Sequence, residues 1–262
     1  LLRLKLQLMR YKPTTLNFEK TVPLESCSCG MVHRKLDSKL TERLVEVCRQ
    51  QKTTVQAALG AAMLFAVAEK TKNQGKNNYF SFRSSINLRQ RLQPPISNDN
   101  LGAIASAILS FHDLKSNNNF WDLARDIKLK LEKNLARGNA FKQLLIFKSI
   151  LKYFLKNPYQ STVSAALTNI GRINIPHNYG QFELEEISFV TGQAAFGGVF
   201  AAAVSTFREK MLLNFMFSQP SMSRGTVETL ASDMISIIHD VCNQKKLTPN
   251  FIARKKKLRT NF

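Results

Sequence analysis

The sequence predicts an α/β or α+β fold in which helices flank a mixed β-sheet. Apolar residues recur at every third or fourth position in several segments, a spacing typical of amphipathic helices. Other segments alternate apolar with polar residues, which is typical of strands, and glycines or prolines separate them. The expected order is therefore helices, two strands, two helices, four strands and a final helix.

Each expected helix has an apolar stripe, and two of them begin at a residue type that caps helices well, Thr53 or Thr54 and Asn119. Five helices are expected. The first starts at Ser38 and the second at Thr53 or Thr54, and the other three span Asn119 to Arg137, Phe141 to Leu155 and about Arg224 to Asn243. The second is so rich in small apolar residues that we expect it to be buried on most sides.

The segment from Tyr79 to Arg89 separates its side chains onto two faces, because successive side chains of a strand point in opposite directions. One face is apolar apart from Ser84 and carries Phe80, Phe82, Ile86 and Leu88. The other face carries Tyr79, Ser81, Arg83, Ser85, Asn87 and Arg89. We expect the first face to pack on the core and the second to meet water or line a polar cleft.

The remaining strands are expected from shorter patterns. The alternation of residues 1–9 is strand-like, and the other expected strands are Leu101–Phe111, Thr162–Asn169, Phe182–Thr191, Val199–Phe207 and Lys210–Phe217.

The amino-acid composition excludes several classes of protein. The chain of 262 residues is 44% hydrophobic, which excludes a mainly disordered chain. The longest apolar stretch, Val55 to Ala68, is about 14 residues, whereas a membrane-spanning helix needs about 20. There is no secretory signal pattern, and four cysteines do not make a disulfide scaffold. We therefore expect a soluble protein of a reducing compartment, the cytoplasm.

The positive charge is unusual and unevenly placed. Lys and Arg number 38 against 18 Asp and Glu, a formal net charge of +20. Much of it lies in residues 125–156 and in residues 245–262, and the first of these segments puts Arg125, Lys128, Lys130 and Lys133 on the outer face of a helix. Nucleic acid, an anionic membrane, an acidic protein or a phosphate-bearing cofactor would fit, and so would a merely solvated basic surface.

Common catalytic and metal signatures are missing: there is no phosphate-binding glycine loop and no Gly-x-Ser-x-Gly elbow. Cys27, Cys29 and His33 supply three soft ligands, but Cys48 belongs to a core-facing helix and no fourth ligand is evident, so we expect reduced thiols and no metal. The other histidines, His112, His177 and His239, have no Ser, Cys or carboxylate partner suggested by the sequence and are expected at surface or capping positions.

Several segments, taken in order, resemble one enzyme superfamily. Ser85-Ile-Asn-Leu-Arg-Gln-Arg-Leu-Gln-Pro-Pro-Ile-Ser97 followed by Asn100-Leu-Gly is similar to a pattern in the second lobe of chloramphenicol-acetyltransferase-like acyltransferases. Residues 53–59, 120–125 and 168–172 are similar to further pieces, and the resemblance covers about residues 15–243. The branch that it resembles most is that of phthiocerol dimycocerosyl transferases and condensation domains.

The resemblance implies one lobe of a two-lobed fold with a tunnel between the lobes. In the family, a His-His-x-x-x-Asp motif of the first lobe supplies the general base, and this chain contains no His-His pair. We therefore interpret residues 1–36 as a connector from a missing N-terminal lobe, residues 37–244 as the C-terminal lobe and residues 245–262 as a basic tail. A degenerate homologue without catalysis is the alternative.

The resemblance also implies site residues, none of them catalytic in this chain. Arg89 matches the arginine that pairs with the aspartate of the missing motif, a structural strut, and a strand-end arginine in solvent is the alternative. Asn87 and Ser85 would line the cleft. Thr168 and Asn169 match a strand end that faces the tunnel, where an amide donor would stabilise a thioester oxyanion, although Thr-Asn before Gly171 is also typical of a turn.

The sequence therefore predicts half of an acyltransferase that transfers an acyl group to an alcohol or amine. Its co-substrate would be acyl-CoA or acyl-phosphopantetheine on an acidic carrier protein, with no bound cofactor and no specific nucleic acid. The alternatives are a non-catalytic protein that binds acyl carriers or lipids and a basic nucleic-acid-binding protein. The coding sequence upstream of Leu1 would separate the enzyme from the binder.

Overall fold

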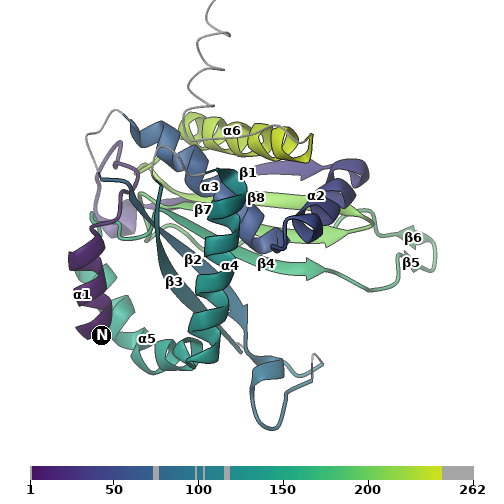
Figure 1. Ribbon diagram of the computed structural model, residues 1–262, viewed down its shortest axis with the longest axis horizontal. Coiled ribbons are helices and arrows are strands. Elements are labelled where there is room, and N and C mark those ends of the chain that lie inside the picture. The colour runs from purple at the N-terminus through teal and green to yellow at the C-terminus, as the bar shows by residue number, and fades with distance from the viewer. Residues whose placement is uncertain (1, 73–76, 98, 103, 115–118, 244–262) are drawn as a thin grey trace, which may run out of the picture.

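The protein is built around a six-stranded mixed sheet (Figure 1). The computed structural model describes residues 2–72, 77–97, 99–102, 104–114 and 119–243. The strand order is β1-β8-β7-β4-β2-β3. The strands are β1 Ser28–Leu36, β2 Tyr79–Asn87, β3 Ala105–Asp113, β4 Ala165–Arg172, β7 Phe200–Phe207 and β8 Lys210–Gln219. Only the pairs β2–β4 and β4–β7 are parallel, so the expected mixed sheet is confirmed.

Helices cover one face of this sheet and form the main core with it. These helices are α2 Ser38–Gln50, α3 Val55–Thr71, α4 Phe120–Ala136 and α6 Arg224–Cys242. Figure 1 shows α6 and α3 lying along that face. Gly60 of α3 packs against the ring of Phe82 on β2, and α3 is almost wholly buried, as its small apolar residues predict. Residues of the sheet and of all four helices share the largest apolar cluster.

The helix starts follow from capping chemistry. The side chain of Asp37 accepts a hydrogen bond from the backbone N–H of Leu40 at the start of α2 (2.8 Å). Thr54 and Asn119 do the same at the starts of α3 and α4, which confirms both expected caps. Each cap satisfies one of the N–H groups that the first turn of a helix leaves without an internal partner.

Two further helices lie beside β3, at one edge of the sheet. They are α1 Leu2–Tyr11 and α5 Asn139–Lys156, and Figure 1 shows them next to each other. The expected strand over residues 1–9 is therefore wrong. Leucine is a strong helix former, and the segment docks by its side chains, with Tyr11 stacked on Phe111 of β3 at 4.8 Å between ring centroids, rather than by a strand ladder.

The expected strand Phe182–Thr191 is also wrong, apart from its first two residues. A two-stranded hairpin, β5 Asn178–Tyr179 and β6 Phe182–Glu183, projects from the sheet. Beyond it, backbone carbonyls of Ile187 and Phe189 accept hydrogen bonds from the side chains of Ser205 on β7 and Asn214 on β8, both at 2.8 Å. Side-chain donors of the sheet thus replace the backbone ladder that a strand would need.

Several expected strands have different ends, and β4 spans Ala165–Arg172 rather than Thr162–Asn169. β3 begins at Ala105 rather than Leu101, after Gly102 with a φ of 149°. β2 ends at Asn87 rather than Arg89, because the Asn87 side chain accepts a hydrogen bond from the N–H of Arg89 (3.0 Å) and turns the chain into a short 3₁₀ helix, Arg89–Arg91. The segment interpreted as a connector contains β1, an edge strand paired with β8. The predicted basic tail, residues 245–262, lies outside the described residues.

Candidate functional site

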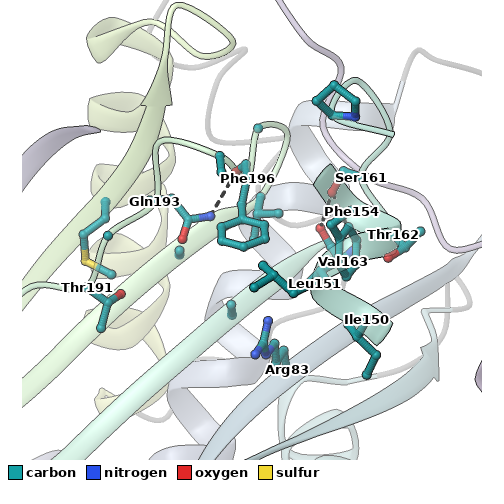
Figure 2. A pocket seen from close by; sticks show the side chains of 18 of the residues that line it. Arg83, Ile150, Leu151, Phe154, Ser161, Thr162, Val163, Thr191, Gln193 and Phe196 are labelled. Carbon is teal, nitrogen blue, oxygen red and sulfur yellow. Dashed lines mark hydrogen bonds between the residues drawn. The ribbon is translucent and has the colours of Figure 1, made fainter. Parts of the chain in front are cut away.

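A cavity of about 270 Å³ opens on the sheet face opposite the main core (Figure 2). Its floor consists of side chains from β2 and β4, including Arg83, Ser85, Ala166 and Thr168. One wall is α5, with Phe147, Ile150, Leu151 and Phe154. The segment from Thr191 to Val199 forms the other wall. The cavity thus joins parts of the chain that are distant in sequence, and its lining is mainly apolar.

Ser85 and Thr168, two of the residues predicted to line a cleft, lie together in this cavity. Their side-chain oxygens are 2.8 Å apart, at hydrogen-bond distance. The parallel register explains the meeting: Ser84 of β2 is paired with Leu167 of β4, so the residues that follow both point away from the main core. Two hydroxyls share one hydrogen bond here, which leaves one hydroxyl proton available to an acceptor in the cavity.

Asn87 and Asn169 do not line the cavity. The side chain of Asn87 is exposed and accepts the hydrogen bond from Arg89 that ends β2. The side chain of Asn169 accepts a hydrogen bond from the backbone N–H of Gly171 (2.8 Å), where Gly171 has a φ of 76°. Both amides therefore perform turn chemistry, the alternative that the sequence left open for Asn169.

Arg89 binds its own loop. One terminal nitrogen of its guanidinium donates to the carbonyls of Asn100 and Gly102, each at 3.0 Å. Its Nε is buried and has no hydrogen-bond partner within the part of the chain that the structure describes. The arginine therefore fixes the loop after β2, and its Nε–H remains available to a further acceptor. Its role as a strut to an aspartate of another lobe stays a prediction.

Arg83 is the residue of this cavity that the sequence analysis did not single out. It is half-buried, and burial lowers the pKa of its guanidinium below the usual value. Figure 2 shows its nitrogens directed from β2 toward Leu151 and Phe196. The sequence did contain a signal, since Arg83 is a charged residue in the middle of a strand, between two residues that are expected to be buried. The sequence does not show, however, whether an acidic side chain faces this arginine.

A second polar cluster joins β3 to α4. His112 Nε2 lies 2.7 Å from Ser110 Oγ, and His112 Nδ1 lies 2.7 Å from Asp126 Oδ2. Lys130 also donates to Asp126 (2.8 Å) and to the carbonyl of Phe111 (2.7 Å). The expectation of a surface or capping role for His112 is wrong, since its side chain is 0% exposed.

The pKa shifts in this cluster indicate the protonation states of His112 and Asp126. Burial lowers the pKa of His112, and its hydrogen bond to Asp126 only partly offsets that effect. Burial acts to raise the pKa of Asp126, but hydrogen bonds from His112 and Lys130 outweigh it, so the carboxyl pKa is lowered. A neutral imidazole facing a carboxylate carries its proton on Nδ1, and Nε2 then accepts from Ser110. The order of groups is that of a serine hydrolase triad, but Ser110 is buried between β3 and α4, so we assign a structural role.

The cysteines are all free thiols. Burial raises the pKa of Cys48 to about 12 and that of Cys242 to about 11, so both thiols stay protonated in the core. Cys29 lies on the edge strand β1 and Cys27 immediately precedes this strand, and both thiols are near backbone carbonyls. Within the described ranges, no three His, Cys, Asp or Glu side chains gather as a metal site.

The spacing of the family's second histidine and aspartate does occur once, at His33 and Asp37. His33 lies on β1 with its Nδ1 2.7 Å from Oδ1 of Asn214. Asp37 is the N-cap of α2. The two side chains have separate partners on different elements, so this pair does not reproduce a base and its aspartate.

Many of the cations on the outer face of α4 have partners. Arg125 donates to Asp122 and to the carbonyl of Gln51, and Lys128 donates to the carbonyl of Lys52. On α5, Lys148 and Lys152 are exposed, but neither is among the residues that line the cavity. Of the helices in the described ranges, none combines the length and the apolar character that crossing a bilayer requires.

Solved structures with this fold come from acyltransferases and peptide synthetases. TRI3 trichothecene 15-O-acetyltransferase from Fusarium sporotrichioides matches with a TM-score of 0.74 and 16% identity, over 90% of this chain and 51% of that chain. Polyketide synthase associated protein 5 from Mycobacterium tuberculosis matches with a TM-score of 0.57 and 15% identity, over 80% and 53%. The epimerization domain of the third module of tyrocidine synthetase B matches with a TM-score of 0.65 and 13% identity, over 90% and 53%.

These identities establish the fold alone, and the chain spans about half the length of the structures that it matches. A search of curated proteins found no match. The family model for the phthiocerol/phthiodiolone dimycocerosyl transferase C-terminus matches residues 25–219. The expected likeness to the second lobe of chloramphenicol-acetyltransferase-like enzymes is therefore confirmed, and the chain belongs to the family of phthiocerol/phthiodiolone dimycocerosyl transferase C-terminal domains.

Proposed function

We propose that this chain forms the C-terminal half of an acyltransferase and that its cavity holds the acyl group. The whole enzyme would transfer that group from a CoA or carrier-protein thioester to an alcohol or amine. The cavity is the observation that carries the proposal: it is mainly apolar, it lies on the sheet face opposite the main core, and it contains the two hydroxyl residues expected there, Ser85 and Thr168.

Exposed apolar side chains support a partner lobe. Phe147, which lines the cavity, is 52% exposed, Leu145 of the same helix is 86% exposed, and Phe182 of the projecting hairpin is 70% exposed. Exposed apolar side chains that gather on a surface are typical of one that another domain or ligand covers. We propose that a lobe with the His-His-x-x-x-Asp motif covers them and supplies the base that this chain lacks.

The positive charge of α5 supports an acidic acyl donor. Lys148, Lys152 and Lys156 are exposed at intervals of four residues on this helix, and other residues of the helix form one wall of the cavity. A row of cations favours phosphates of CoA or the acidic surface of a carrier protein. Such donors, together with the free thiols, support a cytoplasmic location.

The purified 262-residue chain is expected to catalyse no acyl transfer by itself, because no histidine lies among the lining residues of the cavity to accept the acceptor's proton. The measurement is release of free thiol from octanoyl-CoA in the presence of an alcohol or an amine. Turnover well above the uncatalysed rate would show that the chain contains a base, and the proposal of a divided site would then be wrong.

Filling the cavity is expected to abolish binding of a neutral acyl thioester, octanoyl-pantetheine. Ala166→Phe places a ring in the floor between Arg83 and Thr168, where the alkyl chain would lie. Ala105→Phe at an exposed position of β3 is the matched control. Ligand-observed NMR measures both, and at least a tenfold weaker affinity is expected for Ala166→Phe alone. Equal affinities of the two variants would contradict an acyl site in this cavity.

A further inference from the structure

Arg83 is placed in the cavity by strand geometry, among neutral neighbours. Side chains of β2 alternate, so Phe82 and Ser84 point into the main core and Arg83 points to the opposite face. The residues beside it in the sheet are Leu109 of β3 and Ala166 of β4. Neither can accept a hydrogen bond through its side chain, so the floor of the cavity presents the guanidinium without a partner at its sides.

Among the residues that the structure describes, no acid compensates this charge. Arg83 is the single ionisable side chain among the described residues that line the cavity. Burial alone accounts for its lowered pKa, with no contribution from a carboxylate or a hydrogen bond. A guanidinium removed from water without an acceptor costs stability. Such a group is typical of a site that receives its counter-charge from a ligand.

The neighbouring groups define the chemistry of that ligand. The Ser85–Thr168 pair can donate one hydroxyl proton near the guanidinium. One N–H of the Gln193 amide is engaged, since it donates to the carbonyl of Phe196 (3.0 Å). One planar guanidinium and one hydroxyl match the two oxygens and the single charge of a carboxylate, whereas a phosphate dianion would call for further cations.

The remainder of the cavity is suited to an alkyl chain. Phe147, Leu151 and Phe154 of α5 face Val163 and Met216 across it. A volume of about 270 Å³ lies just below the range of roughly 300–1,000 Å³ that is usual for ligand pockets, and it is too small for a whole CoA molecule.

We infer that Arg83 binds the carboxylate of an amphipathic acyl ligand, a fatty acid or an acyl group that ends in a carboxylate, while the alkyl chain lies along α5. The inference rests on the proposed function in one respect, that this cavity is the acyl site. It adds a charge requirement that the family fold by itself does not impose.

The test compares three eight-carbon ligands on the 262-residue chain by calorimetry: octanoate, its neutral amide octanamide, and octyl phosphate. Octanoate is expected to bind at least about tenfold more tightly than octanamide, as for a hydrogen-bonded charge pair. Arg83→Met should remove that preference and leave octanamide binding in place, and Arg83→Lys should retain part of it. Arg49→Gln is the matched control, because Arg49 is exposed on α2, on the other face of the sheet.

Equal affinities of octanoate and octanamide for the wild-type chain, or a preference that survives Arg83→Met, would overturn the inference. Tighter binding of octyl phosphate than of octanoate would overturn the assignment to a carboxylate. If octanoyl-pantetheine binds and Ala166→Phe abolishes its binding, the proposed function stands whichever way the charge test ends. If none of these ligands binds, both proposals fail.

Stability gives a second readout that separates a ligand-binding arginine from a structural one. Arg83→Met replaces an unpaired, half-buried cation by an apolar side chain within an apolar lining. It is therefore expected to raise the Tm of the unliganded chain by about 2–4 °C. A lowered Tm would indicate that the guanidinium holds the fold together, and it would contradict the assignment.

Discussion

Replacing His112 by alanine is expected to lower the free energy of unfolding by about 3 kcal/mol. The imidazole is fully buried, and it accepts from Ser110 on the same strand while donating to Asp126 on α4. Alanine would remove the imidazole that accepts from Ser110, whose hydroxyl would keep only its longer hydrogen bond to the carbonyl of Phe82 (3.3 Å), and would leave a cavity between β3 and α4. Urea unfolding monitored by circular dichroism measures the change.

The same cluster predicts how stability depends on pH. Because the pKa of folded His112 lies below its unfolded value of 6.5, the unfolded chain binds more protons between these two pKa values. The contribution of His112 is therefore complete above about pH 6.5 and is lost as the pH falls toward the folded pKa, with a slope of at most about 1.4 kcal/mol per pH unit. The lowered pKa of Asp126 acts at lower pH, below 3.8.

Two variants make this prediction specific. His112→Asn cannot titrate, but its amide N–H lies near the place of Nδ1 and retains the bond to Asp126, so a smaller loss of stability and a flatter pH dependence than in the wild type are expected. His239→Ala removes an exposed histidine near the end of α6 and should change stability by less than about 0.5 kcal/mol. Wild-type and His112→Asn curves that stay parallel between pH 5 and about 7 would rule out the assigned role.

Gly60→Val is expected to destabilise the fold by about 3 kcal/mol, because no space exists for a side chain there. A Cβ at Gly60 would lie 2.6 Å from the ring of Phe82, and that ring is fully buried in the main core. The clash would push α3 away from β2. Since Arg83 follows Phe82, binding of octanoate should weaken as well.

A compensating change tests the cause. Phe82→Leu shortens the side chain opposite Gly60, so the double variant is expected to lose less stability than the sum of the two single variants. Gly225→Val is the matched control, because a Cβ at this exposed position of α6 meets open space. If the losses of stability of the two single variants simply add in the double variant, the contact between Gly60 and Phe82 is not the reason for the destabilisation by Gly60→Val.

The sequence predicted those parts of the fold that depend on local rules. The stripe of α4 and its cap at Asn119 depend on residues within a few positions of one another, and both are confirmed. The two faces of β2 follow from alternation alone. Alternation was not sufficient for residues 1–9, because leucine is also a strong helix former and the segment contacts β3 through the side chain of Tyr11 rather than through a strand ladder.

Part of the candidate site could likewise be predicted from the sequence. Ser85 was identifiable as a residue of the polar face of β2, and Thr168 through a family pattern, and the parallel register brings their hydroxyls together. Arg83 was visible on the same face, but its isolation was not, since that depends on which residues of α5 and of the Thr191–Val199 segment close the cavity. Ser110 and His112 are two residues apart, yet their carboxylate comes from Asp126 on another element.

The amino-acid order by itself determined the class of fold, the caps, the buried face of each main helix and the family, because these follow from periodicity and from residues near one another in the chain. Only the tertiary structure decided which charges are compensated. His112 obtains a carboxylate when α4 packs on β3, and Arg83 obtains none when α5 and the Thr191–Val199 segment close over β2 and β4. The free energy of a buried charge depends on the groups around it in space, and those groups come from distant parts of the chain.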